Sequence, residues 1–155
     1  MFYRFPFESE IYPDLSRIPL HVRMKLDLAG VKISLKDWLA YSMEERGVLC
    51  HLPVDAEEEK ENFVSYLDFL SRRYHGKKTA RVEPVLNPPW DSLDRVPDPV
   101  EARSKEEGEP VMPDEWKGWN ICQRYAAYKL SISKNEPEKF REALQEFREQ
   151  ASGNR

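Results

Sequence analysis

The sequence predicts an all-α fold, a single compact bundle of about six helices packed around one central helix in the C-terminal half of the chain. Residues 116–132, read at the helical period, are apolar over roughly twice the ~100° arc that a surface helix needs. Amphipathic stretches with helix-capping residues recur along the rest of the chain. Strands alternating with helices, which a nucleotide-binding fold requires, are missing from the pattern.

The composition suits one helical domain, residues 1–155, with a frayed tail at residues 152–155. The net charge is −4 and the two signs are interspersed, which predicts no general attraction to nucleic acid or to anionic membranes. The two cysteines, Cys50 and Cys122, form neither a metal-type pair nor a disulfide framework. We therefore expect two reduced thiols in the core.

The chain carries no signal for a membrane or for secretion. Its apolar runs fall short of the ~20 residues that span a bilayer. The N-terminal residues lack the long apolar core of a signal peptide. These observations predict a cytoplasmic protein.

Residues 1–13 form an arm rich in aromatic residues. Pro6 and Pro13 argue against a helix there, so we expect an extended segment. Its rings are expected to dock on the domain; docking on a partner is the alternative.

Residues 18–30 have two interpretations. Pro19 suits the first position of a helix and Gly30 its end. The apolar residues also alternate with polar ones and continue past Gly30, which would fit a β-hairpin. We favour the helix because methionine, lysine and leucine are good helix formers and the following segments are helical.

Three helices follow, each preceded by a capping residue with an acid three positions later. The pairs are Ser34–Asp37, Ser42–Glu45 and Asp55–Glu58. Pro53 ends the second helix and Gly76 ends the third. The third helix has acids in its first turn and basic residues in its last, which matches the helix dipole.

The proline-rich connection spans residues 77–113 and holds seven of the 12 prolines. One short helix is expected within it, from Pro99 to Glu107, with Asp98 as its cap. Long connections of this kind are uncommon unless they are functional or disordered, so the segment is a candidate partner-binding strap. The central helix follows, and a last amphipathic helix begins at a cap on Asn135.

The residue pattern offers no recognisable chemistry. The three histidines have no metal-ligand partner at helical spacing, and the scattered glycines form no phosphate-binding loop. Nucleophile motifs are absent, and the acids of residues 57–61 fit a solvated first turn. We therefore predict no catalytic residue, no metal and no cofactor, and a protein that is not an enzyme.

Binding to DNA is an alternative that the pattern leaves open. A helix ending at Gly30, a short turn and a helix over residues 34–41 have helix-turn-helix spacing. The first helix is basic, but the second offers mainly apolar side chains where a reading helix would expose basic or amide groups.

One ordered set of motifs covers residues 5–147. Its specific parts are the runs from Ile18 to Trp38 and from Gln123 to Ser131. Shorter matches are Phe5-x-Phe7-Glu8, Glu45-Arg46, Leu52-Pro53, Pro88-Pro89-Trp90 and Trp116. The whole pattern resembles the nitrate reductase-associated protein family, small bacterial proteins found largely in cyanobacteria. The resemblance implies a gene neighbourhood shared with assimilatory nitrate reductase and molybdenum-cofactor synthesis, and it assigns no catalytic residue.

We therefore predict a non-catalytic accessory protein of assimilatory nitrate reductase or of its molybdenum-cofactor maturation, acting by protein binding. Arginine and lysine beside aromatic rings can hold a partner's carboxylates or an anion. The predicted contact residues are Arg17, Arg23, Lys25, Lys117, Asn120 and Arg124. Binding of a small anion, such as a pterin phosphate or nitrate, is a second alternative. Arg124 could instead pair with a carboxylate of a neighbouring helix.

Overall fold

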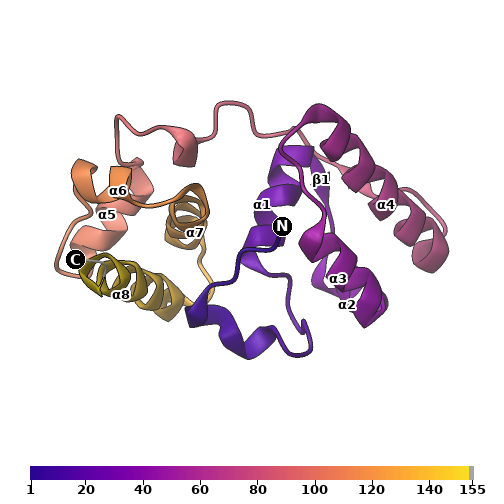
Figure 1. The fold of residues 1–155 in the computed structure, drawn as a ribbon, viewed down its shortest axis with the longest axis horizontal. Coiled ribbons are helices and arrows are strands. Elements are labelled where there is room, and N and C mark those ends of the chain that lie inside the picture. Colours follow the sequence, from indigo (N-terminus) through magenta and orange to yellow (C-terminus); the bar gives the residue numbers. More distant parts are fainter. Residues whose placement is uncertain (154–155) are drawn as a thin grey trace. The chain divides into compact units, whose positions relative to one another are not determined.

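The computed structural model describes residues 1–153, and these are mostly helical (Figure 1). The predicted all-α fold class is confirmed, since the strands among these residues are two residues long. Contacts group the chain into two compact units, Met1–Leu86 and Asn87–Arg155. The boundary lies inside the predicted proline-rich connection, and the single domain stays a prediction. Among the described residues, no helix has the length and apolar character to cross a membrane.

Unit 1 contains one 3-10 helix, four α-helices and a small sheet. In chain order these are η1 (Pro6–Ile11), α1 (Leu20–Ala29), β1 (Val31–Lys32), α2 (Leu35–Ala40), α3 (Met43–His51), α4 (Glu57–His75) and β2 (Ala80–Arg81). Helix α1 contacts α3 and α4, and its Val22 and Leu26 lie in the same buried cluster as Phe63 and Leu67 of α4. The core of unit 1 therefore forms around α1.

The helix predicted for residues 18–30 is confirmed, and the hairpin alternative is wrong. Gly30 adopts a left-handed conformation with φ 75° and ends α1. Strand β1 then pairs antiparallel with β2, in the register Val31 with Arg81 and Lys32 with Ala80. A Cβ atom on Gly30 would lie 2.7 Å from the Cγ of Pro84, so the close approach of that chain also requires glycine.

Local capping sets most helix starts in unit 1. The predicted capping boxes of Ser34 with Asp37 and of Ser42 with Glu45 are both present. The third was predicted one residue early. The cap of α4 is Ala56, whose N–H donates to Glu59 Oε1 at 2.8 Å; alanine has no side-chain acceptor, so only this half of the capping box is formed.

The arm is only partly extended. Pro6–Ile11 forms a 3-10 helix, so the expectation that the prolines exclude a helix was wrong: Pro6 lies in the first turn, where no N–H is needed. The expected docking of its rings is confirmed. The Phe2 ring centroid lies 5.6 Å from that of Tyr12 and 6.3 Å from that of His21, and Phe5 is buried.

Unit 2 contains five helices among the described residues. They are η2 (Pro89–Asp91), α5 (Asp98–Glu106), α6 (Pro113–Gly118), α7 (Ile121–Ile132) and α8 (Pro137–Gly153). Helix α7 contacts α5, η2 and α8, so it is central in this unit, as Figure 1 shows. Helix α5 starts one residue before the predicted first position, with Pro97 as its cap. Residues 152 and 153 of the predicted tail belong to α8, and residues 154–155 lie outside the described part.

The continuous helix predicted over residues 116–132 is wrong. Helix α6 ends at Gly118, Trp119 is extended with ψ 152°, and Asn120 begins α7 in a capping box with Gln123. The apolar period continues across this break, which is why periodicity alone missed it. Trp116 and Trp119 are buried, whereas Ile121 and Ile132 remain 40% and 47% exposed.

Candidate functional site

The three predicted contact residues of unit 1 differ in their exposure to solvent. Arg17 and Arg23 are exposed, and Arg23 Nε donates to the carbonyl of Ile18 at 3.2 Å. Lys25 is only 1% exposed. Its Nζ donates to the carbonyls of Leu49 at 3.3 Å and Cys50 at 2.6 Å in the last turn of α3, where a positive charge is favoured. Lys25 therefore positions α3 against α1 and is out of a partner's reach.

The three predicted contact residues of unit 2 separate in the same way. Lys117 and Asn120 are exposed, and Asn120 caps α7. Arg124 is buried, and burial lowers the pKa of its guanidinium. It donates to the carbonyls of Trp90, at 2.8 Å, and Trp119. Arg124 thus binds backbone carbonyls rather than the carboxylate of a neighbouring helix that the sequence left as an alternative.

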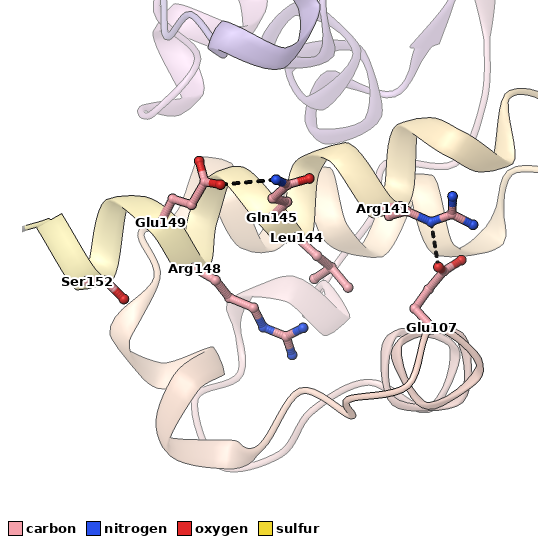
Figure 2. Close-up of a pocket in the computed structure, with 7 residues that line it drawn as sticks. All are labelled: Glu107, Arg141, Leu144, Gln145, Arg148, Glu149 and Ser152. Atoms are coloured by element: carbon pink, nitrogen blue, oxygen red, sulfur yellow. Dashed lines mark hydrogen bonds and ion pairs between the residues drawn. The ribbon is translucent and has the colours of Figure 1, made fainter.

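A hollow of about 540 Å³ lies along α8 (Figure 2). Its lining residues are Glu107, Arg141, Leu144, Gln145, Arg148, Glu149 and Ser152. Arg141 Nε lies 2.7 Å from Glu107 Oε2, and Arg148 is bound to Glu115. Because both arginines are paired with carboxylates, this hollow offers an anion little uncompensated positive charge.

The part of the connection that lies in unit 2, residues 87–112, is called the strap below. Arg124 holds its Trp90 carbonyl, and Trp116 Nε1 donates to the Ser92 carbonyl at 2.8 Å. The Trp90 ring packs edge-on against Tyr125 with centroids 4.9 Å apart and lies 5.6 Å from the Tyr128 ring. The first half of the strap is therefore held by α6 and α7.

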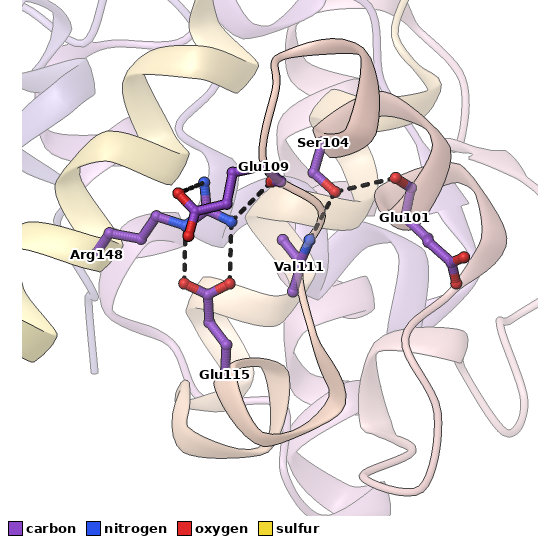
Figure 3. Close-up of polar contacts among 6 residues, drawn as sticks. All are labelled: Glu101, Ser104, Glu109, Val111, Glu115 and Arg148. Carbon is purple, nitrogen blue, oxygen red and sulfur yellow. Dashed lines mark hydrogen bonds and ion pairs between the residues drawn. The ribbon is translucent and has the colours of Figure 1, made fainter.

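The second half of the strap is held by two further side chains (Figure 3). The Ser104 hydroxyl, fully buried, accepts the Val111 N–H at 2.9 Å and donates to the Glu101 carbonyl at 3.0 Å. Arg148 binds both carboxylate oxygens of Glu115, at 2.8 and 3.0 Å, and its Nη2 donates to the Glu109 carbonyl at 3.0 Å. The hydrogen bond to Glu115 raises the pKa of Arg148. The strap, in which η2 and α5 are joined by irregular stretches, is thus fixed at several points.

Two hollows lie on this fixed strap, and Arg95 lines both of them. The first has a volume of about 470 Å³ and is lined by Asp94, Arg95, Val96, Glu101, Lys105, Pro110, Val111, Met112 and Pro113. The second has a volume of about 310 Å³ and is lined by Pro89, Ser92, Arg95, Pro97, Asp98, Pro99 and Tyr128. Arg95 Nη2 lies 2.5 Å from Asp98 Oδ1, but both side chains are more than two-thirds exposed, so the pair is weakly held.

A buried polar cluster in unit 1 was missed by sequence reasoning. Burial raises the pKa of Glu8 to about 7, although Tyr12 donates to its Oε1 at 2.6 Å. Glu8 also accepts the Leu20 N–H at 3.3 Å and so replaces the cap that Pro19 lacks. Burial and the charge of Lys25 lower the pKa of His21 to about 4, and its Nδ1 accepts the Tyr3 N–H. The available signal was an acid in an apolar arm followed by a helix without a capping side chain.

Comparison with known proteins decides the family. The model of the conserved nitrate reductase-associated protein family matches residues 4–147. The chain belongs to this family. No curated protein and no solved structure matches the chain. The family match includes the strap and most of both units.

The residues that carry the nitrate reductase-associated pattern hold segments together. Arg124 holds the strap, and Lys25 holds α3 against α1. Arg46 donates to the carbonyls of Trp38 at 3.1 Å and Leu39 at 2.9 Å, at the end of α2, and to the Asp14 carbonyl at 3.2 Å. In this chain, Lys25, Arg46 and Arg124 thus join segments by binding backbone carbonyls.

Proposed function

We propose that this chain is a non-catalytic, cytoplasmic accessory protein that binds nitrate reductase, or a protein of its molybdenum-cofactor maturation, through the strap. The family description links the chain to nitrate reductase. The observation that carries the proposal is the pair of hollows that Arg95 lines, in a segment held by Arg124, Trp116 and Arg148.

The physical argument is preorganisation. Interfaces gain affinity when apolar side chains enter pockets that are already formed, because little ordering is left to do on binding. Prolines line both hollows, and Leu93 and Met112 of the strap are 41% and 60% exposed. The partner segment would insert one apolar side chain into each hollow. A carboxylate of the partner would bind Arg95 in place of Asp98.

The predicted contact residues now divide into two groups. Arg17, Arg23 and Lys117 are exposed and remain proposed contacts for the partner, whereas Asn120 is exposed but already caps α7. Lys25 and Arg124 hold backbone carbonyls inside the protein, and their proposed role becomes structural.

The two alternatives receive less support from the geometry. A DNA-reading helix would be α2, but it is six residues long and its Trp38 is buried. For a small anion, the charges of Lys25 and Arg124 are already engaged. A thermal-shift titration with phosphate or nitrate tests that alternative, since a ligand at one hundred times its Kd adds about 2.7 kcal/mol.

The proposal is tested by co-purification from nitrate-grown cells, with nitrate reductase and the molybdenum-cofactor proteins identified by mass spectrometry. We expect the tagged chain to retain one of them, and Arg95→Glu to lower the amount retained by about tenfold, since reversing a charge at an interface places like charges together. Lys134→Glu, which changes an exposed lysine outside the strap by the same charge, is the matched control. Equal retention by both variants, or none by the unmodified chain, would contradict the proposal.

A further inference from the structure

Unit 1 carries a second surface that the proposed function does not use. Aromatic and acidic side chains from the segment joining α2 and α3, from α3 and from α4 gather there. They are Tyr41, Glu45, Tyr66, Phe69 and Tyr74, and we call them the aromatic–acidic face. Phe69 is 55% exposed and Tyr74 36%, so both rings are accessible from the surface.

The carboxylate of this face is largely buried but stays ionised. Glu45 accepts hydrogen bonds from the Tyr74 hydroxyl at 2.5 Å and from the Ser42 N–H at 2.8 Å, and its side chain is 12% exposed. Burial acts to raise the pKa of Glu45, but the hydrogen bonds from Tyr74 and Ser42 outweigh it and the pKa is lowered. A charged acceptor therefore lies beside the exposed rings.

A buried polar group beside the Tyr74 ring lacks a hydrogen-bond partner. Tyr41 is 2% exposed, and its hydroxyl forms no hydrogen bond with any residue in the described range 1–153. Its ring centroid lies 5.8 Å from that of Tyr74. Burial, together with the charges of Asp37 and Glu45, raises the pKa of Tyr41 to about 12. A buried hydroxyl without a partner is costly, and a donor that reached its oxygen would remove that cost.

The chain itself shows which kind of group fits this face. The guanidinium of Arg73 lies 5.7 Å from the Tyr74 ring centroid, and its Nη1 is 3.8 Å from Glu45 Oε2. That distance exceeds a hydrogen bond, and the Arg73 side chain is 60% exposed. Arg73 is therefore held weakly. On the neighbouring side, His75 Nε2 lies 3.1 Å from Asp37 Oδ1.

We propose that the aromatic–acidic face binds one arginine side chain of a protein partner, which displaces Arg73 from Glu45 and lies against the ring of Tyr74. Arginine fits better than lysine because its planar group stacks on aromatic rings while its several N–H donors reach a carboxylate and a hydroxyl together. This inference rests on the proposed role in protein binding, but it assigns a site in unit 1 and the chemistry of what enters it.

The direct test is an NMR titration of the full-length ¹⁵N-labelled chain with N-acetyl-arginine amide. We expect saturable shifts of backbone amides in residues 41–45 and 69–75, with a Kd on the order of millimolar for a single side chain. N-acetyl-citrulline amide has nearly the same shape without the charge, and we expect it to cause no saturable shift. Equal responses to the two probes would overturn the inference.

Single substitutions distinguish an effect of the Glu45 charge on binding from a loss of folded structure. Glu45→Gln keeps an acceptor oxygen for Ser42 and Tyr74 and removes only the charge, and we expect about fivefold weaker binding of the arginine probe. Arg73→Gln removes the internal competitor and should tighten binding by about two- to fivefold. Arg72→Gln, a neighbouring exposed residue, is the matched control and should change nothing. An unchanged Kd in a folded Glu45→Gln protein would also overturn the inference.

The co-purification result is independent of this titration. Retention of nitrate reductase without binding of the arginine probe overturns the site in unit 1 and leaves the strap proposal standing. Binding of the probe without retention of any nitrate reductase or cofactor protein supports the site and contradicts the strap proposal.

Discussion

The arm of unit 1 and the strap of unit 2 are attached to their units by different kinds of polar side chain. Both contain irregular stretches around a short helix, η1 in the arm and α5 in the strap, and both are held by buried polar groups. The arm depends on Glu8, whose carboxyl titrates near neutrality, and on neutral His21. The strap depends on Arg124 and Arg148, which stay charged at any ordinary pH. We therefore expect attachment of the arm to depend on pH and attachment of the strap not to.

The largest expected effect is loss of the buried guanidinium that holds the strap. Arg124→Ala leaves the carbonyls of Trp90 and Trp119 buried and unpaired, and we expect a loss of about 3 kcal/mol in the free energy of unfolding, equal at pH 5 and pH 8. Urea unfolding followed by tryptophan fluorescence measures it. Lys117→Ala, at an exposed site in the same unit, should stay within about 0.5 kcal/mol. A loss that varied with pH would remove the contrast with the arm.

A somewhat smaller effect, and one that depends on pH, is expected in the arm. The pKa of Glu8 is raised from 4.5 to about 7 in the folded protein, so its contribution to stability is fully present below pH 4.5 and is lost as pH rises through 7. Glu8→Gln keeps the acceptor for Leu20 and removes the titration. Relative to the unmodified chain, this variant should gain up to about 3 kcal/mol between pH 4.5 and pH 7.

The matched measurement is the difference between the two proteins in urea unfolding at several pH values. His21 titrates in both proteins and acts in the opposite direction: its pKa is lowered to about 4, so its contribution is present above pH 6.5 and lost as pH falls through 4. Subtraction removes this effect. A difference that did not change with pH would show that the Glu8 carboxyl titrates normally.

The smallest expected effect is local to the strap. Ser104→Ala removes the acceptor of the buried Val111 N–H, and we expect a loss of about 1–2 kcal/mol. Hydrogen exchange at the Val111 amide should accelerate more than exchange at amides of α7, because the opening is confined to the second half of the strap. Ser152→Ala, near the end of α8, is a control in the same unit. Uniform acceleration across unit 2 would indicate instead that Ser104 supports the whole unit.

Local features of the sequence predicted most helix ends. Ser34 and Ser42 begin α2 and α3 as expected, because the capping box joins residues three positions apart. The start of α4 was missed by one residue, since Glu59 supplies the cap to an alanine. The break before Asn120 was also missed. Its capping box with Gln123 was readable, but the apolar period on both sides of it favoured one continuous helix.

The candidate sites were much less predictable. Six polar residues were expected at the surface because of their charge and their aromatic neighbours, yet Lys25 and Arg124 are buried. Their acceptors lie 25 and 34 positions away along the chain, at Cys50 and Trp90. The hollows beside Arg95 depend on the same long-range contacts, so the proline-rich composition indicated a strap without indicating its pockets.

An all-α protein and most helix ends were predictable from the sequence alone, because caps and apolar periods act within about four residues. The family was predictable from the order and spacing of its motifs. Only the tertiary structure showed that Lys25 and Arg124 are buried and that the Phe69 ring is exposed. A side chain is buried only when segments distant in the chain meet around it, and a backbone carbonyl becomes its partner only when that meeting leaves the carbonyl without water.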